Sequence, residues 1–334
     1  MIPVRRALLQ GGMALAASAA VPELLLAQTA PAGPAARSFN PQPQGWRTFE
    51  ITTRVELADP VGRTRIWLPI PSIESEWQRS LDSSFSTTGT ARIDSDGVDG
   101  ARMLTAEFDD GVEPVVELTS RVQTRNRAWS KTTPTATVLD AGARHHFTRA
   151  TALLPTDGIV RQTALRITRG VQGDLAQARA IYDWVVAHAW REPTVRGCGE
   201  GDIKTMLETG HMGGKCADIN ALFVGLCRSV GLPARDVYGI RLAPSAFGYK
   251  ELSANPEQLK GAQHCRAEVF LAGWGWVAVD PADVAKVMRQ ETPQWIKTVQ
   301  DPLVQPVYQH LFGGWEGNWL GWNVAHDVRL PHSE

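Results

Sequence analysis

The stretch "HMGGKCADINALFVGLCRSVGLPAR", residues 211–235, places a cysteine directly after two glycines and a lysine. Beyond Cys216, apolar residues recur in steps of three and one, which is the spacing of an amphipathic helix. They are Ile219, Leu222, Phe223, Leu226, Cys227 and Val230. Gly231 suits the end of a helix, and Pro233 prevents its continuation. The pattern therefore predicts a helix whose first turn contains Cys216.

The predicted position of Cys216 favours the thiolate form of its side chain. Unpaired backbone N–H groups and the positive end of the helix dipole face a residue in the first turn. The backbone N–H of Cys216 could also donate to an oxyanion that develops at an attacked carbonyl group. The alternative is a small buried residue at a helix start, and this stretch alone does not decide between the two. Cys227 lies roughly 16 Å further along the helix, so we interpret it as a core residue.

A second stretch, "QHCRAEVFLAGWGWVAVDPADV" at residues 263–284, predicts a β-hairpin. Apolar residues alternate with others on both sides of a glycine-containing turn, so strands are expected over residues 264–271 and 275–280. His264 begins the first strand, and Asp280 ends the second. Because a hairpin folds its two ends together, we expect His264 and Asp280 to lie near each other.

These residue types form the set that a cysteine nucleophile needs. An imidazole keeps the thiol ionised and protonates the leaving group, and a carboxylate orients the imidazole and stabilises its positive charge. Cys216, His264 and Asp280 are therefore a candidate catalytic triad. Each has an ordinary structural explanation when taken singly. Their joint occurrence with consistent geometry favours catalysis.

With these residues in place, the chain resembles the bacterial transglutaminase-like proteins of the papain-like cysteine-enzyme superfamily. The matching segments are "GGKCADINALFVGLCRSVGLPAR" and "HCRAEVFLAGWGWVAVDPADV". The cysteine, histidine and aspartate of the family fall on Cys216, His264 and Asp280. The resemblance covers residues 150–290. It implies an α+β fold with a papain-like, transglutaminase-like core, in which the nucleophile helix packs on an antiparallel sheet.

Two positions depart from the family pattern. Cys265 and Arg266 follow the histidine, where many members carry a small residue and then an aromatic one. Because neighbouring residues of a strand point to opposite faces, we expect Cys265 to point away from His264. No motif identifies the family's additional oxyanion donor. Gln263 and Trp190 are candidates for that role or for a place in the substrate groove, with structural roles as the alternative.

The first thirty residues have a basic start, an apolar middle and a small-residue exit, which is typical of an export signal. Arg5 and Arg6 give it a loose resemblance to a twin-arginine signal. The alternative is an uncleaved anchor helix, but Pro22 and Glu23 interrupt the apolar run before it reaches a membrane-spanning length. We expect cleavage after Ala27, which gives a periplasmic or secreted protein without a stable membrane span.

The rest of the chain divides by composition. Residues 31–45 are rich in Pro, Ala and Gly and indicate a linker. Short alternating segments separated by Asp-Gly turns predict a β-sandwich domain over residues 46–130, and such a region often precedes this type of domain. The catalytic domain is expected over residues 150–290. The tryptophan-rich extension of residues 291–334 is expected to pack over the core or to line a substrate groove.

Composition and motifs exclude several function classes. The chain has 34 Lys and Arg and 35 Asp and Glu, so its charge does not favour nucleic acid or a membrane surface as partner. Nucleotide-binding glycine patterns, an EF-hand loop and C-x-x-C spacings are absent from the sequence, so no cofactor is expected. A metal held by His326, Asp327 and His332 is the alternative. A Cys198–Cys265 disulfide is one pairing that the sequence leaves open.

Two hypotheses for function follow. The first is an exported thiol enzyme that acts on amide bonds of proteins or peptides, with a thioester that water or an amine resolves. Water would make the protein a peptidase or amidase, and an amine would make it a cross-linking enzyme. The second is a non-catalytic binding or scaffold protein that keeps the fold. The presence of all three triad residues favours the first.

Overall fold

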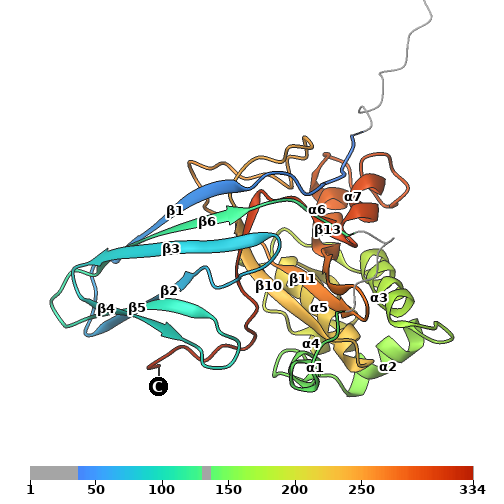
Figure 1. Cartoon of the computed structure of the whole chain (residues 1–334), viewed down its shortest axis with the longest axis horizontal. Helices are drawn as coiled ribbons and strands as arrows, with labels where there is room; N and C mark the ends of the chain where they lie inside the picture. The colour runs from blue at the N-terminus through green and yellow to red at the C-terminus, as the bar shows by residue number, and fades with distance from the viewer. Residues whose placement is uncertain (1–36, 130–136, 334) are drawn as a thin grey trace, which may run out of the picture. The chain divides into compact units, whose positions relative to one another are not determined.

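The structure is a computed structural model that describes residues 37–129 and 137–333, and these residues belong to one compact unit (Figure 1). The predicted export signal at residues 1–30 and the first part of the predicted linker, residues 31–36, lie outside the described residues. Within the described part of the chain, no helix combines the length and the apolar character needed to cross a membrane.

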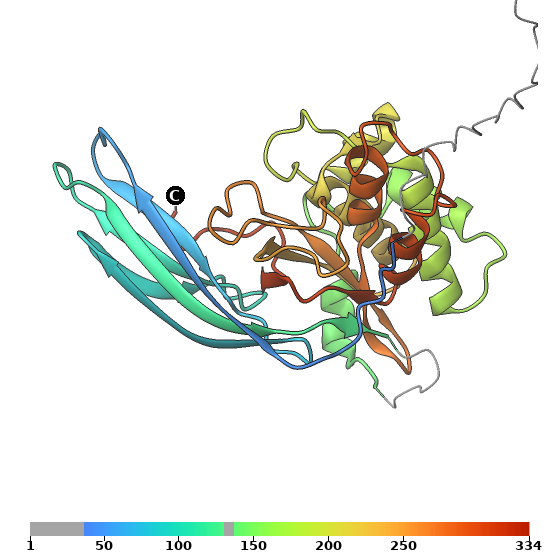
Figure 2. The same ribbon diagram turned by 90° about the horizontal axis from the view of Figure 1, so that it is seen from above.

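The strands predicted over residues 46–130 are present and form two three-stranded antiparallel sheets, coloured blue to green in Figures 1 and 2. One sheet has the order β1 (Arg47–Glu56), β6 (Val115–Thr124) and β3 (Gln78–Thr87). The other has the order β2 (Thr64–Ile70), β5 (Arg102–Phe108) and β4 (Thr90–Ser95). Apolar residues of both sheets, among them Leu68, Leu104 and Leu118, share one hydrophobic cluster. This shared burial is what holds the two sheets together.

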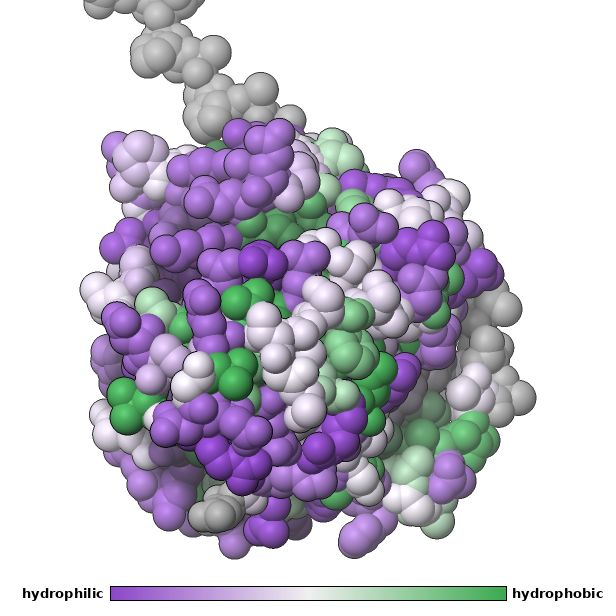
Figure 3. All heavy atoms as spheres, turned by 90° about the vertical axis from the view of Figure 1, so that its left-hand side faces the viewer, coloured by the Kyte–Doolittle hydropathy of each residue, from purple (hydrophilic) through white to green (hydrophobic). Residues whose placement is uncertain are grey.

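Figure 3 shows the face of the molecule that carries these strands, where apolar side chains appear as separate green patches among hydrophilic ones. Exposed apolar residues of the strand region include Leu57, Val61, Leu81, Phe85, Ile93 and Val98. Scattered exposure of this kind is ordinary for a folded protein. It therefore gives no reason to infer a binding surface here.

A four-stranded antiparallel sheet carries the second half of the chain, in the order β12, β11, β10, β14. Its bounds are β10 (Ala234–Arg241), β11 (Arg266–Leu271), β12 (Gly275–Val279) and β14 (Trp319–Asn323). The hairpin predicted over residues 264–280 is confirmed, because β11 and β12 pair with Ala267 opposite Val279.

Helix α5 (Cys216–Ser229) begins at the cysteine, as predicted, but it is not a surface helix. Every residue except Ala217 is buried, because α5 packs against β10 and β11 and against several other helices. Its polar residues can be buried because they have partners. The Arg228 guanidinium donates to the Ala234 carbonyl at 2.8 Å, and the Asn220 amide donates to the Cys265 carbonyl at 2.7 Å.

The remaining elements surround this core. They are the helices α1 (Ala141–Thr148), α2 (Gly158–Ile167), α3 (Asp174–His188), α4 (Ile203–Thr209), α6 (Pro281–Gln290) and α7 (Gln305–His310), and the short strands β7 (Arg127–Ala128), β8 (Trp190–Arg191), β9 (Gly213–Gly214) and β13 (Gly314–Trp315). Strand β8 pairs with β9 in parallel, and β7 pairs with β13 in the antiparallel sense. The β8–β9 pair leads the chain directly into α5.

The tryptophan-rich segment at residues 291–334 is part of the core and supplies a strand of the central sheet. Trp315 and Trp319 are each 1% exposed, and β14 pairs with β10 along one edge. The Gln78 side chain donates to the Gly321 carbonyl at 2.7 Å and accepts from its N–H at 2.8 Å. These bonds fix β14 to the strand region as well as to β10.

Candidate active site

Cys216 is the first residue of α5 and is 3% exposed. The turn before it is fixed by Asp218, whose carboxylate accepts hydrogen bonds from the backbone N–H groups of Lys215 and Gly201, both at 2.8 Å. Gly214 has to be glycine here, because a Cβ atom at this position would lie 2.6 Å from the Cβ of Asp218. The Gly-Gly-Lys-Cys sequence thus allows the backbone before α5 to pass close to the Asp218 side chain.

The structure brings His264 and Asp280 together at the open end of the hairpin. His264 Nε2 and Asp280 Oδ2 are 2.8 Å apart, and the two side chains are buried. Asp280 also caps α6, since its Oδ1 accepts from the Asp283 N–H at 3.0 Å. The backbone N–H of His264 donates to the carbonyl of Gly239 in β10 at 3.0 Å, so β10 fixes the backbone of His264. Asp280 therefore has a fixed position from which it can orient the imidazole.

His264 is close enough to Cys216 for its charge to lower the pKa of the Cys216 thiol, and Asp280 holds the His264 ring. The neighbouring Cys198 and Cys265 thiols lower the pKa of Cys216 well below its usual value, and His264 lowers it further. Burial acts in the opposite direction but is outweighed. This shift favours the thiolate form of Cys216, which is the nucleophilic form.

Asp283 is a second carboxylate at His264 that the sequence analysis missed. Its Oδ1 lies 3.2 Å from His264 Nε2, and it forms a buried ion pair with Arg241. Burial alone would lower the pKa of His264, but the charges of Asp283 and Asp280 outweigh burial and raise this pKa to about 9. His264 is thus an imidazolium at neutral pH. The spacing Asp-Pro-Ala-Asp at the start of a helix was the signal available in the sequence, since it puts both carboxylates in the first turn.

Cys265 was predicted to point to the face opposite His264, but its sulfur lies beside that of Cys216. The sulfur atoms of Cys198, Cys216 and Cys265 all lie within 4.8 Å of one another. The reason is that β11 begins only at Arg266, so the alternation of faces along a strand does not apply to the two residues before it. The Cys198–Cys265 disulfide is not formed, and all four cysteines are free.

The two candidate oxyanion or groove residues lie in different places. Gln263 pairs with Ile240 through an isolated bridge and lines a cavity of about 510 Å³ together with Cys198 and Cys265. Trp190 instead lines a separate cavity, and its ring packs against Gly213 in the approach to α5. Gln263 therefore faces the space from which a ligand can reach the cysteines, whereas Trp190 supports the backbone before Cys216.

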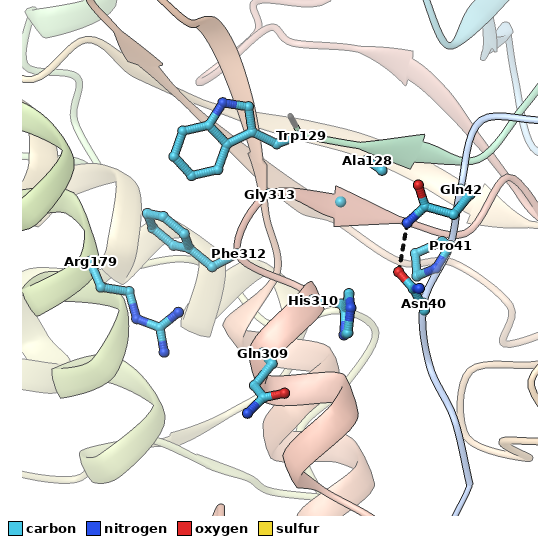
Figure 4. Close-up of a pocket in the computed structure, with 11 residues that line it drawn as sticks. Asn40, Pro41, Gln42, Ala128, Trp129, Arg179, Gln309, His310, Phe312 and Gly313 are labelled. Carbon is cyan, nitrogen blue, oxygen red and sulfur yellow. Dashed lines mark hydrogen bonds between the residues drawn. The ribbon is translucent and has the colours of Figure 1, made fainter. Parts of the chain in front are cut away.

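Figure 4 shows another cavity, of about 480 Å³, that lies apart from these residues. Its lining includes Arg179, Phe312, His310 and Trp129, with none of the three candidate triad residues among them. The Arg179 guanidinium is already engaged, because it pairs with Asp183 at 2.8 Å and lies over the ring of Phe312. We therefore assign to the candidate active site the cavity that Cys198 and Cys265 line.

The alternative metal set of His326, Asp327 and His332 does not come together. His326 lies between Asp236, at 3.8 Å, and Asp327, at 3.1 Å, whereas His332 lies 3.6 Å from Asp94 in β4. His326 and Asp327 instead line the cavity to which Cys198 and Cys265 also contribute. The alternative is wrong as a ligand set.

Comparisons with known proteins identify the type of domain. Residues 161–281 match the family model of the transglutaminase-like superfamily. A protein of Haemophilus influenzae (strain ATCC 51907 / DSM 11121 / KW20 / Rd), named "Uncharacterized protein", is 35% identical over 305 residues, which are 84% of this chain and 80% of that protein. Residues 161–281 of the chain are thus a transglutaminase-like domain.

The fold of this transglutaminase-like protein is also found among solved structures. A crystal structure of a "Putative Cysteine Protease" from Cytophaga hutchinsonii aligns with a TM-score of 0.53 at 17% identity, over 72% of this chain and 78% of that one. The periplasmic domain of TgpA from Pseudomonas aeruginosa aligns with a TM-score of 0.38 at 17% identity, over 76% and 77% of the two chains. The first of these supports the transglutaminase-like fold.

Two groups that support the transglutaminase-like site lie outside the matched residues 161–281. Asp283 follows two residues after the end of the match. Trp319, in β14, donates its indole N–H to the His264 carbonyl at 2.9 Å and is buried beside the Arg266 guanidinium. No local sequence pattern could have linked Trp319 to His264, because their contact depends on the pairing of β14 with β10.

Proposed function

We propose that this transglutaminase-like protein is an exported cysteine enzyme that acts on amide bonds of proteins or peptides through a thioester. The observation that carries the proposal is the position of Cys216 in the first turn of α5, in the same site as His264, which Asp280 holds at 2.8 Å. A thiolate and an imidazolium side by side are the two groups that acyl transfer requires.

The proposed reaction begins with attack of the Cys216 sulfur on the carbonyl carbon of the scissile amide. The oxyanion that forms is placed to accept a hydrogen bond from the backbone N–H of Cys216. The His264 imidazolium gives its proton to the leaving nitrogen, the C–N bond breaks and a thioester remains on Cys216. Neutral His264 then takes a proton from water or from an amine as it attacks the thioester, and the thiolate is released.

The roles of the surrounding residues follow from their contacts. Asp280 and Asp283 keep the His264 ring oriented and charged until it gives up its proton. The cavity lined by Cys198, Cys265 and Gln263 is the proposed route of the acyl group to Cys216. No cofactor takes part in these steps. Export to the periplasm or the medium is part of the proposal, and it rests on the sequence of residues 1–30.

The first experiment measures the pH dependence of alkylation at Cys216 by peptide mass in the mature protein and in His264→Ala. We expect rapid labelling well below the ordinary thiol pKa of about 8.5 in the wild type and a shift to higher pH in the variant. Labelling at ordinary thiol pH in both proteins would contradict the proposal and favour the binding or scaffold alternative.

The second experiment identifies the acyl acceptor. Peptides and glutamine-containing proteins are incubated with the enzyme in the presence and absence of a primary amine, and products are read by mass. Free acid or cleaved peptide indicates hydrolysis, whereas a product that carries the amine indicates acyl transfer. A Cys216→Ala variant is the control, and product formation in this variant would overturn the assignment of the nucleophile.

A further inference from the structure

Three of the four cysteines meet at one point, although they come from separate segments of the chain. Cys198 lies in the loop between β8 and α4, Cys216 starts α5, and Cys265 precedes β11. Their sulfur atoms are all within 4.8 Å of one another. Among the described residues, the other convergent set of metal-ligating side chains is His264, Asp280 and Asp283, which already has its role in the candidate active site.

The backbone around the first turn of α5 fixes the position of each outer cysteine. The Cys198 carbonyl accepts from the Ala217 N–H at 2.9 Å, and the Cys265 carbonyl accepts from the Asn220 side chain at 2.7 Å. Both bonds come from residues within one turn of Cys216. The three sulfur atoms are thus held by one structural unit, so their convergence does not depend on a chance rotamer of a surface loop.

The proposed reaction uses only one of the three thiols. Formation of the thioester on Cys216 needs His264 and a carbonyl substrate, and neither Cys198 nor Cys265 is required for attack, proton transfer or release. Cys227 shows what a purely structural cysteine looks like in this chain, because it is fully buried in α5 among apolar neighbours and away from the cluster. The extra pair of sulfur ligands beside the nucleophile therefore calls for another explanation.

We propose that Cys198, Cys216 and Cys265 form a three-sulfur binding site for a soft d10 metal cation, with Zn²⁺ and Cu⁺ as the biological examples. Thiolate sulfur is the ligand that such cations prefer. Three thiolates around a zinc ion at the usual Zn–S distance of about 2.3 Å lie roughly 4 Å apart. The sulfur separations in this protein, at most 4.8 Å, need only a small contraction to reach that arrangement.

The site also has an entry path and room for a fourth ligand. Cys198 and Cys265 line the cavity of about 510 Å³, while Cys216 lies behind them. A cation that enters through this cavity meets the two outer sulfur atoms first and can keep a water molecule on the cavity side. Binding releases the protons of the Cys198 and Cys265 thiols to solvent, since the thiolate is the coordinating form.

Occupancy of this site and catalysis exclude each other, because the lone pair that Cys216 would use in attack is engaged by the metal. The enzyme would be held inactive while the cation is bound and would be released by a chelator. This consequence rests on the proposed function, whereas the metal site itself does not.

The test is a titration of the reduced, metal-free mature protein with Cd²⁺, followed by the ultraviolet charge-transfer absorption of cadmium–thiolate bonds. We expect one Cd²⁺ per chain in the wild type. Cys198→Ala and Cys265→Ala should each weaken binding by at least 10–100-fold, about the loss seen when even an outer group of a metal site is removed. Cys227→Ala is the matched control and should bind Cd²⁺ as the wild type does. Absorption that is absent, or equal in all four proteins, would overturn the proposal.

X-ray absorption spectroscopy of the Zn²⁺-loaded wild type makes the test independent of whether a variant folds. We expect three sulfur neighbours at about 2.3 Å, and fewer than three would overturn the proposed ligand set. The two proposals fail separately. A protein that binds Cd²⁺ through three sulfur atoms but shows no turnover after metal removal would contradict the proposed function and leave the metal site intact.

Discussion

At the scale of single residues, the main finding is that His264 faces two carboxylates, of which only Asp280 was expected. Burial would raise the pKa of Asp283, but the charges of Arg241 and His264 hold it well below its usual value. Asp283 is thus a permanently ionised neighbour that keeps the imidazole protonated. The reactivity of Cys216 depends on this charge through His264.

The first prediction concerns the pH dependence of turnover. Because the pKa of His264 is raised to about 9, from an ordinary value of 6.5, the imidazolium is present at neutral pH and is lost as the pH rises through 9. We expect kcat/KM to fall above about pH 9, since the leaving nitrogen then lacks its proton donor. Protonated His264 also contributes to the free energy of unfolding. This contribution is fully present below pH 6.5 and is lost as the pH rises through about 9.

Asp280→Asn provides the check on that assignment. Removal of the charge should move the basic limb of the pH–rate profile to lower pH and reduce kcat/KM by roughly 100-fold or more. His188→Ala, a change at an exposed histidine of α3, is the matched control and should leave the profile unchanged. An unshifted limb in Asp280→Asn would show that the carboxylate does not act on His264.

The second prediction is a loss of stability in Asp283→Asn. The variant leaves the Arg241 guanidinium buried and without its partner, so the free energy of unfolding should fall by roughly 3–5 kcal/mol. Urea denaturation measures this change. Asp82→Asn, which removes a carboxylate from the exposed pair with Arg121, is the control and should change stability far less. Equal effects in the two variants would refute the argument from burial.

Sequence patterns identified the three candidate triad residues but missed part of their surroundings, for reasons that differ by residue. Cys216, His264 and Asp280 sit at element ends that glycine, proline and alternation mark clearly. Cys265 was misplaced because the start of β11 is uncertain by a residue or two from sequence, and that shift changes which face a side chain takes. In the sequence, Asp283 could be recognised only as a second acidic residue three positions after Asp280.

At the scale of elements, α5 departs most from its sequence pattern, because its surroundings bury the polar face as well as the apolar one. The spacing predicted the helix and its start, but it could not reveal that Asn220 and Arg228 would find partners on other segments. The junction of β9 with α5 is closely packed, because Gly214 lies against the Asp218 side chain. Small changes there should displace Cys216 relative to His264.

The third prediction tests this junction with Gly214→Ala. The added methyl group would lie 2.6 Å from the Cβ of Asp218, so the start of α5 must move. We expect a loss of roughly 1–3 kcal/mol in stability, together with slower alkylation of Cys216. Gly45→Ala is the control, since the space around Gly45 is open, and it should affect neither measurement. Wild-type alkylation in Gly214→Ala would contradict the close approach.

At the scale of the whole molecule, the transglutaminase-like domain is completed by chain far outside the matched residues 161–281. Strand β14 closes one edge of the central sheet, and Gln78 of β3 binds it through two hydrogen bonds. The composition indicated a tryptophan-rich extension, but composition does not specify strand pairing over such a distance. That is why the fourth strand of the sheet could not be predicted.

The fourth prediction follows from this pairing. Deletion of residues 314–334 removes β13 and β14. It should prevent stable folding, although all of the matched residues 161–281 are retained. Circular dichroism with urea denaturation measures the outcome. A shorter deletion of residues 328–334 removes mainly exposed chain and should keep a cooperative transition close to that of the full chain. A cooperative transition in the longer deletion would mean that β14 is dispensable.

The place of β14 in the chain has a consequence for biosynthesis. Ribosomes make proteins from the N-terminus, so α5 and the segment that carries His264 emerge well before Trp319. Until β14 emerges, β10 has an open edge and the His264 carbonyl lacks its indole partner. The candidate nucleophile therefore acquires its full setting only after β14 has emerged and paired with β10.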